Sequence, residues 1–305
     1  GASLTTNWKL SDALTVTSVT AYDYGKNFVP EDTDGSPLRT IESQYNGKAR
    51  QFSQDLRLAS GFDGPFDFIL GAYYNVETIR AGTAYHYFND LDVNVDGVVD
   101  FNDCLDPNAA FFLSCTYQNS YKQRKRSVAV YSDMSFDLSD RVILRGGLRY
   151  TRDRGNLTEF KSQLIGADGV VLANTVPGDP VDLDATTGIR FSKGTVTGKL
   201  GIDFKTADND LIYANYSRGY RSNAFNAQAF FSPTELTVAK PETVNAYELG
   251  FKSQLAGRSV TLNGAVFYYD YRNQQALNID TNSIQTLVNI PKSRIMGGEL
   301  ELNAR

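Results

Sequence analysis

The sequence has little of what enzymes and helical membrane proteins usually contain. Its 305 residues include two cysteines and one histidine. The lone histidine, His86, lies outside any G-x-S-x-G context, so no Ser-His-Asp arrangement can be read and no enzyme is expected. No run of about 18 consecutive apolar residues occurs, which excludes a transmembrane helix.

Charge and hydropathy narrow the class further. The net charge is −5 at pH 7, so the chain carries no basic footprint for nucleic acid. The mean hydropathy of −0.34 is too polar for a helical membrane protein. Neither value argues against an outer-membrane barrel, because a transmembrane β-strand needs only about 9–11 residues of alternating hydrophobicity. The 18 tyrosines suit a membrane interface, where the ring is buried and the hydroxyl stays wet.

The clearest strand pattern is a hairpin over residues 126–152, with a polar turn at 139–141. One face carries the apolar positions Val128, Val130, Met134, Phe136, Leu138, Val142, Leu144, Leu148 and Tyr150. The other face carries the charged positions Asp133, Asp137, Arg145 and Arg149. A period of two predicts extended strands, because successive side chains point to opposite sides of a sheet.

The same periodicity predicts about eleven strands with alternating short and long connections. The expected strands are 2–10, 13–25, 47–60, 66–80, 120–138, 141–157, 191–206, 210–222, 242–255, 258–273 and 292–304. Short connections are expected around 11–12, 61–65, 139–141, 207–209 and 256–257, and long ones at roughly 26–46, 81–119, 158–190, 223–241 and 274–291. Short periplasmic turns and long extracellular loops are typical of outer-membrane barrels.

Charged positions decide which face of these strands meets lipid. In one expected strand Leu56 and Leu58 oppose Asp55 and Arg57, and other strands repeat the pattern. Because a lipid-facing Arg or Lys costs about 2–4 kcal/mol at the bilayer centre, the apolar set faces out. We therefore predict an all-β fold, an antiparallel up-and-down transmembrane β-barrel segment over residues 1–305. A soluble β-sandwich with similar alternation is the alternative.

Four segments resemble barrel strands of TonB-dependent outer-membrane receptors. They are 54–60 (QDLRLAS), 213–221 (YANYSRGYR), 247–253 (YELGFKS) and 297–301 (GGELE). The resemblance covers nearly the whole chain. It implies a 22-stranded barrel with a plugged lumen, in the outer membrane of a Gram-negative bacterium. About half of those strands are present here, without a plug, a TonB-contact segment or an aromatic-ended final strand, so we expect a piece of a larger protein that contacts TonB through the missing plug.

The long connection at 81–119 contains a segment, 92–103, with the sequence DVNVDGVVDFND. Its oxygen-bearing positions follow the ligand spacing of an EF-hand loop, and Gly97 occupies the sharp turn. The expected Ca²⁺ ligands are Asp92, Asn94, Asp96, Val98, Asp100 and Asp103. The last of these replaces the usual bidentate glutamate, as in the calcium loops of dockerin-type modules, which the segment resembles. A solvated acidic turn without metal is the alternative.

Cys104 and Cys115 are the only cysteines. Beyond an oxidising periplasm, so close a pair predicts a disulfide, which stabilises by about 3 kcal/mol on the chain-entropy model. Calcium and disulfide together would make the connection at 81–119 a rigid extracellular knob. Two free thiols or a metal pair are the alternatives.

Aromatic and basic residues near the long connections are the candidates for binding a solute. We expect Tyr85, His86 and Tyr87 to contact the solute at the knob, unless they only pack there. We expect Arg218 and Arg221 to bind an anionic solute at the lumen mouth. The basic run 122–126 predicts attraction to lipopolysaccharide or to an anionic ligand, with a solvated strand end as the alternative.

Together these features predict an active-transport receptor that binds and imports a scarce solute with TonB coupling. A siderophore, a cobalamin or a glycan would each fit, since similar barrels serve all three classes. The expected partners are outer-membrane lipid and lipopolysaccharide, the small-molecule solute and TonB, but no nucleic acid. A passive porin and a calcium-stabilised surface adhesion protein are the competing readings.

Overall fold

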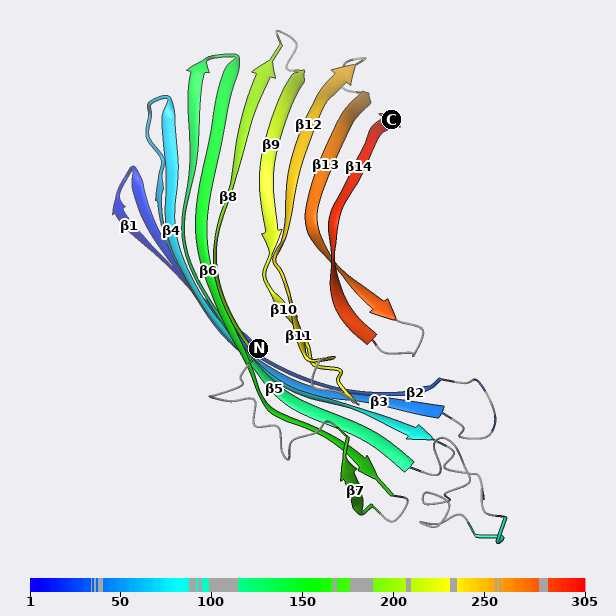
Figure 1. Ribbon diagram of the computed structural model, residues 1–305. Coiled ribbons are helices and arrows are strands. Elements are labelled where there is room, and N and C mark those ends of the chain that lie inside the picture. The colour runs from blue at the N-terminus through cyan, green and yellow to red at the C-terminus, as the bar shows by residue number, and fades with distance from the viewer. Residues whose placement is uncertain are drawn as a thin grey trace.

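The chain forms one strongly curved antiparallel sheet with a concave inner face and a convex outer face (Figure 1). The computed structural model describes residues 1–33, 35, 37, 41–87, 92, 95–98, 115–166, 169–175, 189–206, 210–230, 235–255, 257, 259–279 and 285–304. Within these residues no helix is long and apolar enough to cross a membrane.

The wall of the sheet pairs in chain order, as an up-and-down topology requires. Its strands are β1 (Ala2–Ser11), β2 (Leu14–Asp32), β3 (Ile41–Ser60), β4 (Phe66–Tyr87), β5 (Cys115–Ser139), β6 (Val142–Ile165), β8 (Arg190–Lys205), β9 (Leu211–Arg221), β12 (Glu242–Leu255), β13 (Val260–Ile279) and β14 (Gln285–Ala304). Short turns lie at one end, the turn end, which is uppermost in Figure 1, and the long connections lie at the other, the loop end.

The predicted wall strands are confirmed, but several are longer than the sequence indicated. At the loop end β2 continues to Asp32, β6 to Ile165 and β13 to Ile279. The connection predicted at 81–119 is narrower, because β4 reaches Tyr87 and β5 begins at Cys115. The prediction relied on apolar residues at every second position, and these extensions lack that pattern. Only their backbone pairing with neighbouring strands identifies them as strands.

Three short strands were not predicted at all. β7 (Val171–Asn174) pairs with β6, inside the connection expected to be structureless at 158–190. β10 (Ala224–Asn226) pairs with β11 (Thr237–Ala239), inside the connection expected at 223–241. Strands of three or four residues are too short to establish a period of two in a sequence.

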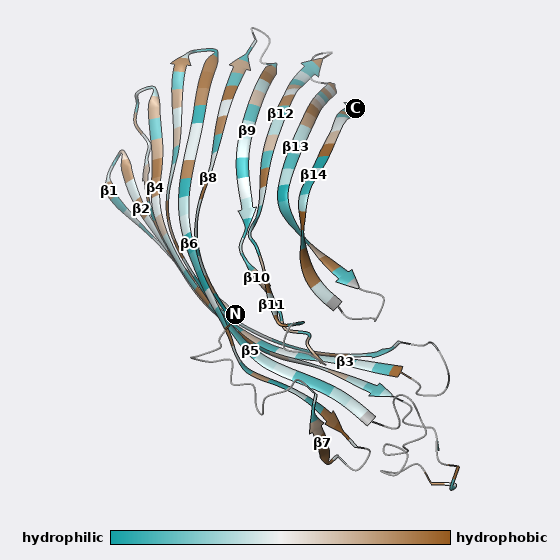
Figure 2. Cartoon of the chain, viewed as in Figure 1, coloured by the Kyte–Doolittle hydropathy of each residue, from teal (hydrophilic) through white to brown (hydrophobic). Residues whose placement is uncertain are grey.

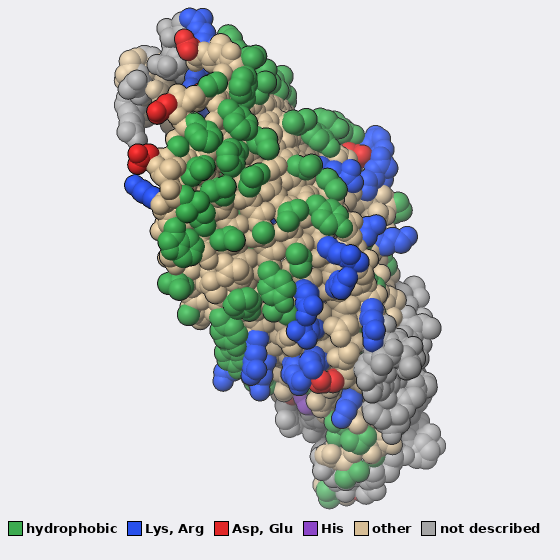
Figure 3. All heavy atoms as spheres, turned by 90° about the vertical axis from the view of Figure 1, so that its left-hand side faces the viewer, with side chains coloured by type: hydrophobic (Ala, Val, Ile, Leu, Met, Phe, Trp, Pro, Cys, Tyr) green, Lys and Arg blue, Asp and Glu red, His purple; other side chains and the backbone are tan. Residues whose placement is uncertain are grey.

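The prediction that apolar residues face outward is confirmed. Leu148 is 60% exposed and Leu200 is 65% exposed, although both lie in the middle of paired strands. Along the wall strands, hydrophobic and hydrophilic residues alternate (Figure 2). Viewed from the convex side, the hydrophobic side chains gather into a broad band toward the turn end (Figure 3). Such a band suits contact with acyl chains.

Two pairs of oppositely charged side chains lie on the concave face of β5, β6 and β8. Arg145 forms an ion pair with Asp203 at 2.8 Å, and Lys199 forms one with Asp133 at 2.5 Å. These four residues come from the set of positions opposite the apolar ones. A polar inner face next to an apolar outer face is the arrangement of a transmembrane barrel, and it excludes the β-sandwich, whose core would be dry.

Candidate solute-binding site inside the barrel

The segment between β9 and β12 folds into the concavity of the wall. We call its described residues, 222–230 and 235–240, the inner hairpin; it contains β10 and β11. In Figure 1 it lies within the curve of the sheet, against the strands β5 and β6. An apolar cluster joins the two layers and consists of Leu157, Phe160, Ala227, Ala229 and Leu236.

A bulge in β6 makes this contact possible. Glu159 has a φ of 54°, and the pairing of β5 with β6 shifts there, between Ser120 and Lys122. Because one extra residue reverses the alternation of faces, Leu157 before the bulge and Phe160 after it both point inward. Their exposures are 0% and 1%. The bulge therefore gives the wall an apolar spot on an otherwise polar face.

Polar contacts fix the tip of the inner hairpin to the wall. The fully buried Asn119 accepts a hydrogen bond from the Thr83 backbone N–H at 3.1 Å and donates one to the Ala227 carbonyl at 3.4 Å. Within the tip itself, the Glu235 carboxylate accepts a hydrogen bond from the Phe230 N–H at 3.1 Å. Buried groups with such partners avoid the cost of desolvation without a hydrogen bond, so the contact is specific as well as apolar.

The end of β9 is held by a buried carboxylate. Asp153, on the inner face of β6, accepts hydrogen bonds from the hydroxyls of Ser127 and Tyr220, each at 2.6 Å. The pairing of β8 with β9 ends at Gly198 and Arg218, and beyond that point β9 moves away from β8 toward the concavity. Asp153 therefore anchors the strand where it leaves the wall.

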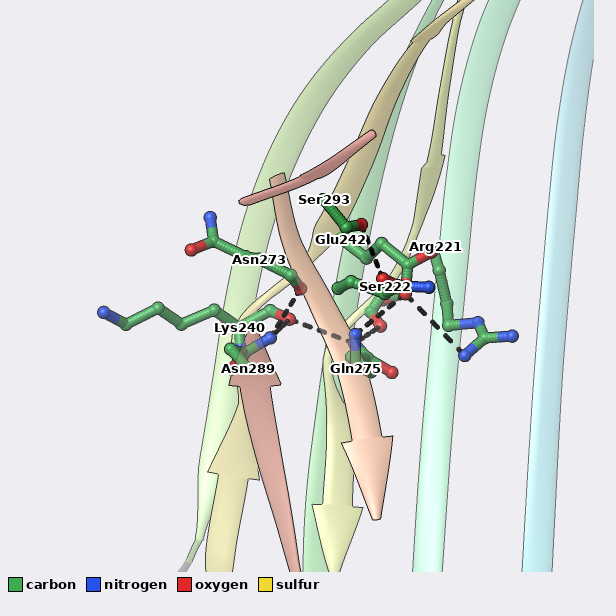
Figure 4. A network of polar contacts seen from close by, with 9 residues as sticks. Arg221, Ser222, Lys240, Glu242, Asn273, Gln275, Asn289 and Ser293 are labelled. Atoms are coloured by element: carbon green, nitrogen blue, oxygen red, sulfur yellow. Dashed lines mark hydrogen bonds and ion pairs between the residues drawn. The ribbon is translucent and has the colours of Figure 1, made fainter. Parts of the chain in front are cut away.

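Two amides clamp the base of the inner hairpin onto β13 and β14 (Figure 4). Gln275 donates from its side chain to the carbonyls of Ser222 at 2.8 Å and Lys240 at 3.0 Å. Asn289 donates to the same Lys240 carbonyl at 3.0 Å and accepts from the Lys240 N–H at 2.8 Å. Both ends of the segment are therefore held by one side of the wall while its tip packs on the other.

A cavity of about 970 Å³ lies where β9 separates from β8. Its described lining combines four basic residues, Lys193, Lys199, Arg218 and Lys240, with outward-facing apolar residues such as Leu148 and Leu200. Lys199 is ion-paired with Asp133 on the inner face, whereas pairing with Gly198 places Arg218 on the face that carries Leu200. The cavity is therefore a gap in the wall that reaches the outer face, and its basic residues come from both faces of the sheet.

Tyrosines cover the concave face at the loop end. The ring of Tyr85 lies 5.3 Å from that of Phe230 in the inner hairpin, and Tyr87 contacts Tyr117 edge-on at 5.9 Å. Burial raises the pKa of the Tyr85 phenol, and a hydrogen bond with Tyr45 raises it further. Burial also raises the pKa of Tyr87 and of Tyr117. The phenols are therefore neutral at physiological pH and offer rings and hydroxyls rather than charge.

The structure brings together only some of the residues predicted to bind the solute. Tyr85 and Tyr87 lie on the inner face, whereas His86 lies on the outer face, where its Nδ1 is 2.7 Å from the Thr116 hydroxyl. Arg218 lines the cavity where β9 leaves the wall, and its pairing with Gly198 places it on the face that carries Leu200, so its role at the lumen mouth stays a prediction. Arg221 lies 3.8 Å from Glu242, an ion pair at the base of the inner hairpin. His86 was grouped wrongly, because adjacent residues of a strand face opposite sides.

The predicted calcium loop is described only at Asp92 and residues 95–98. The Asp92 carboxylate accepts from the N–H groups of Asp96 at 3.0 Å and Gly97 at 2.5 Å. Asn94, Asp100, Asp103 and Cys104 lie outside the described residues, and the Cys115 side chain does too. Among the described residues no group of three or more metal-binding side chains gathers. The expectations of calcium and of a disulfide stay predictions.

Sequence reasoning missed the residues that hold the inner hairpin. Leu157 lay at a predicted strand end and Phe160 beyond it, Gln275 lay in a predicted connection, and Asp153 lay inside a predicted strand as one of several acidic residues. The alanines at 224, 227 and 229 were the one available signal, because small side chains permit close packing of a segment on a sheet. Small residues indicate close packing, but they do not show which strand the segment packs against.

The fold and its inner face agree with a known family. The description "TonB dependent receptor-like, beta-barrel" matches residues 1–305. The chain belongs to the TonB-dependent receptor family. It is accordingly an outer-membrane protein of Gram-negative bacteria, and the eleven wall strands are part of the receptor barrel. The loop end is then the extracellular end and the turn end the periplasmic one.

Individual relatives match part of their own length. The chain is 28% identical over 183 residues to the pesticin receptor of Yersinia enterocolitica serotype O:8, covering 59% of this chain and 24% of the relative. It is 24% identical over 327 residues to the probable TonB-dependent siderophore receptor PiuA of Acinetobacter baumannii, covering 96% of this chain and 40% of the relative. These relatives are receptors rather than enzymes.

A solved structure shows the same fold. The ferric yersiniabactin uptake receptor FyuA from Yersinia pestis superposes with a TM-score of 0.72 at 20% identity. The match covers 99% of this chain and 39% of that one. The chain thus spans well under half the length of these relatives.

Proposed function

We propose that this barrel segment belongs to a receptor that imports an anionic ferric chelate of the siderophore class with TonB coupling, and that it is not an enzyme. Similarity to siderophore receptors carries the proposal, and Arg218, at the point where β9 leaves the wall, is the basic residue that we assign to the anionic part of the solute. Tyr85 and Tyr87, on the inner face at the loop end, add rings on which aromatic parts of a chelate can stack.

Similarity supports this solute class over the others. The relative that spans 96% of this chain is a probable siderophore receptor, and FyuA takes up ferric yersiniabactin. The only histidine is on the outer face, hydrogen-bonded to Thr116, and so offers no general base to the lumen.

The test is uptake and binding by the complete receptor with Arg218→Gln. A charge-assisted hydrogen bond contributes about 1.5–3 kcal/mol, so we expect the Kd of an anionic ferric chelate to rise about 10- to 100-fold. Lys205→Gln is the matched control, since it removes one charge near the periplasmic end of β8 and leaves the cavity intact. A Kd that does not change in the Arg218 variant would overturn the assignment of the cavity.

Energy coupling is tested separately in cells that lack TonB. An active receptor loses uptake of the chelate there, while binding at the cell surface persists. A passive porin keeps the same uptake with and without TonB. Offering ferric chelates, cobalamin and oligosaccharides in parallel then shows which solute class is imported, whatever the result for Arg218.

We also propose that calcium at residues 92–103 and a Cys104–Cys115 disulfide order the extracellular connection between β4 and β5. The support is local, because the Asp92 carboxylate already turns toward the backbone of Asp96 and Gly97, as in a loop that closes on a cation. Calorimetry on the complete receptor, with Asp92→Asn as the comparison, should show heat of calcium binding that the variant loses. Equal heats would contradict the proposal. Loss of cell attachment with normal uptake after deletion of 90–116 would favour an adhesion role.

A further inference from the structure

The outer face carries a basic band between the apolar band and the loop end. Figure 3 shows it as a group of Lys and Arg side chains below the hydrophobic ones, interrupted by very few acids. At its centre are Lys122, Arg124 and Arg126 of β5, Arg152 and Arg154 of β6, and Arg190 of β8. The sequence indicated only the run 122–126; strand pairing brings the other three beside it.

Strand register shows that these side chains point outward. Arg126 continues the set of positions that contains Val128 and Val130, and Arg154 pairs directly with Arg126 across the sheet. Arg124 and Arg190 both pair with Asn156. All of them therefore share the face that carries the lipid-facing residues, on the extracellular side of the apolar band.

Three arginines of this cluster have no carboxylate partner in the described part of the chain. On the inner face Arg145 and Lys199 each have a carboxylate partner. On the outer face Glu159 binds Lys122 at 2.7 Å and Arg80 at 3.2 Å. Arg124, Arg126 and Arg154 form no ion pair with any described carboxylate.

Because Glu159 is ion-paired with Lys122 and Arg80, the unpaired positive charge of the band lies on the arginines beside them. The hydrogen bond from Lys122 lowers the pKa of the Glu159 carboxyl, so the carboxylate stays ionised and occupied at one edge of the band. Arg126 opposite Arg154 is a like-charge pair across two strands, an arrangement that destabilises a sheet unless an anion lies between the two. Arg124, Arg126 and Arg154 thus lack a negative partner among the described residues.

Two adjoining hollows give this surface a shape. The first, of about 560 Å³, is lined by Arg124, Arg126, Arg154 and Arg190, with Gly155 and Ser192. The second, of about 390 Å³, is lined by Arg126, Arg152, Arg154, Val128, Val130 and Tyr150. Arg126 and Arg154 belong to both. A basic hollow is therefore continuous with an apolar one that leads into the lipid-facing band.

We infer that these hollows bind a phosphorylated glycolipid of the outer leaflet, with its phosphate on the arginines and an acyl chain along Val128, Val130 and Tyr150. The planar guanidinium matches phosphate oxygens in bidentate pairs, which explains the arginines at the centre of the cluster. A free anion would need only the basic hollow. The apolar hollow beside it, at the depth where a headgroup meets acyl chains, is what selects a lipid.

The test is a titration of the complete receptor in detergent, with native mass spectrometry to count the bound lipid. Three probes are compared: bisphosphorylated lipid A, the same lipid after removal of its phosphates, and inorganic phosphate. We expect Arg126→Gln with Arg154→Gln to weaken binding of the bisphosphorylated lipid at least tenfold. Lys292→Gln with Arg294→Gln is the matched control, because it removes two charges from β14, away from both hollows, and should bind like the wild type.

Heat-modifiable migration on gels confirms that each variant is folded, and Arg124→Gln with Arg190→Gln serves as a second variant that leaves the shared arginines in place. Weaker binding in both double variants, with little binding of the dephosphorylated lipid, supports the site. Equal binding by the variants overturns it. Competition by inorganic phosphate as strong as by the lipid overturns the choice of a lipid, and binding that ignores the phosphates overturns the role of the arginines.

Discussion

Single residues on the inner face decide how side chains of neighbouring strands fit together. Tyr131 of β5 reaches over β4 to Asp55 of β3, with its hydroxyl 2.8 and 3.1 Å from the two carboxylate oxygens. Arg149 lies 5.3 Å from the rings of both Tyr73 and Tyr131. The ring can take this path because Gly71 has no side chain, and a Cβ there would lie 2.1 Å from Tyr131 Cζ.

Gly71→Ala should therefore displace the Tyr131 ring and break its hydrogen bond to Asp55. We expect a loss of about 1–3 kcal/mol in the free energy of unfolding, since a charge-assisted hydrogen bond and its geometry are lost together. Urea unfolding of the complete receptor measures it. Gly25→Ala is the control, because no atom lies within 4 Å of a Cβ at that position. Equal midpoints for the two variants would contradict this account.

Phe160 is the residue on which the inner hairpin most depends. Its side chain is 1% exposed within the cluster formed with Leu157, Ala227, Ala229 and Leu236. Truncating a buried Phe to Ala costs about 3–5 kcal/mol. We expect Phe160→Ala to raise hydrogen exchange across residues 224–239 while the wall strands stay protected. Leu148→Ala, at a position 60% exposed, should leave that exchange unchanged.

At the scale of elements, strand pairing and the bulge at Glu159 decide what the wall presents. A regular β6 would place Leu157 and Phe160 on opposite faces, and the inner hairpin would then have no apolar surface on the wall to pack against. The bulge was not predictable, because Glu is an ordinary strand or loop residue and nothing in the sequence marks its φ of 54°. Long strands with a strict apolar period were predictable, because every second residue of a membrane-spanning strand faces lipid and must be apolar.

Variants at Glu159 separate its backbone role from its charge. Glycine adopts a positive φ at no steric cost, whereas a β-branched residue there is strained by roughly 1–3 kcal/mol. Both substitutions remove the ion pairs with Lys122 and Arg80. We therefore expect Glu159→Val to be less stable than Glu159→Gly in thermal unfolding, with faster exchange in the inner hairpin. Identical behaviour of the two variants would show that the bulge carries no strain.

At the scale of the whole molecule, the chain is a polar lumen wall on one side and a lipid-facing wall on the other. The inner hairpin spans the concavity from the clamp on β13 and β14 to the seat on β5 and β6. It thereby connects strands that are far apart in the sheet. The cavity where β9 leaves β8 lies beside the base of this hairpin, since Lys240 belongs to both.

The tyrosines at the extracellular end predict how the molecule responds to alkali. Burial raises the pKa of Tyr85, Tyr87 and Tyr117 above that of an unfolded tyrosine. Since neutral phenol is the form favoured by folding, its contribution is fully present below about pH 10 and is lost as pH rises through the folded pKa. Near-UV circular dichroism should stay constant from neutral pH to about pH 10 and decrease above it. A decrease near pH 8 would contradict this.

The sequence by itself determined the wall: its strand period, its short and long connections, the face that meets lipid and, through four short segments, the resemblance to its family. Those features are repeated along the chain because every strand meets the same lipid and the same water. Only the tertiary structure decided the inner hairpin, the cavity at Arg218 and the arginine cluster around Arg126 and Arg154. Each joins residues from strands that are distant in the chain, and register and a single bulge, rather than composition, bring them together.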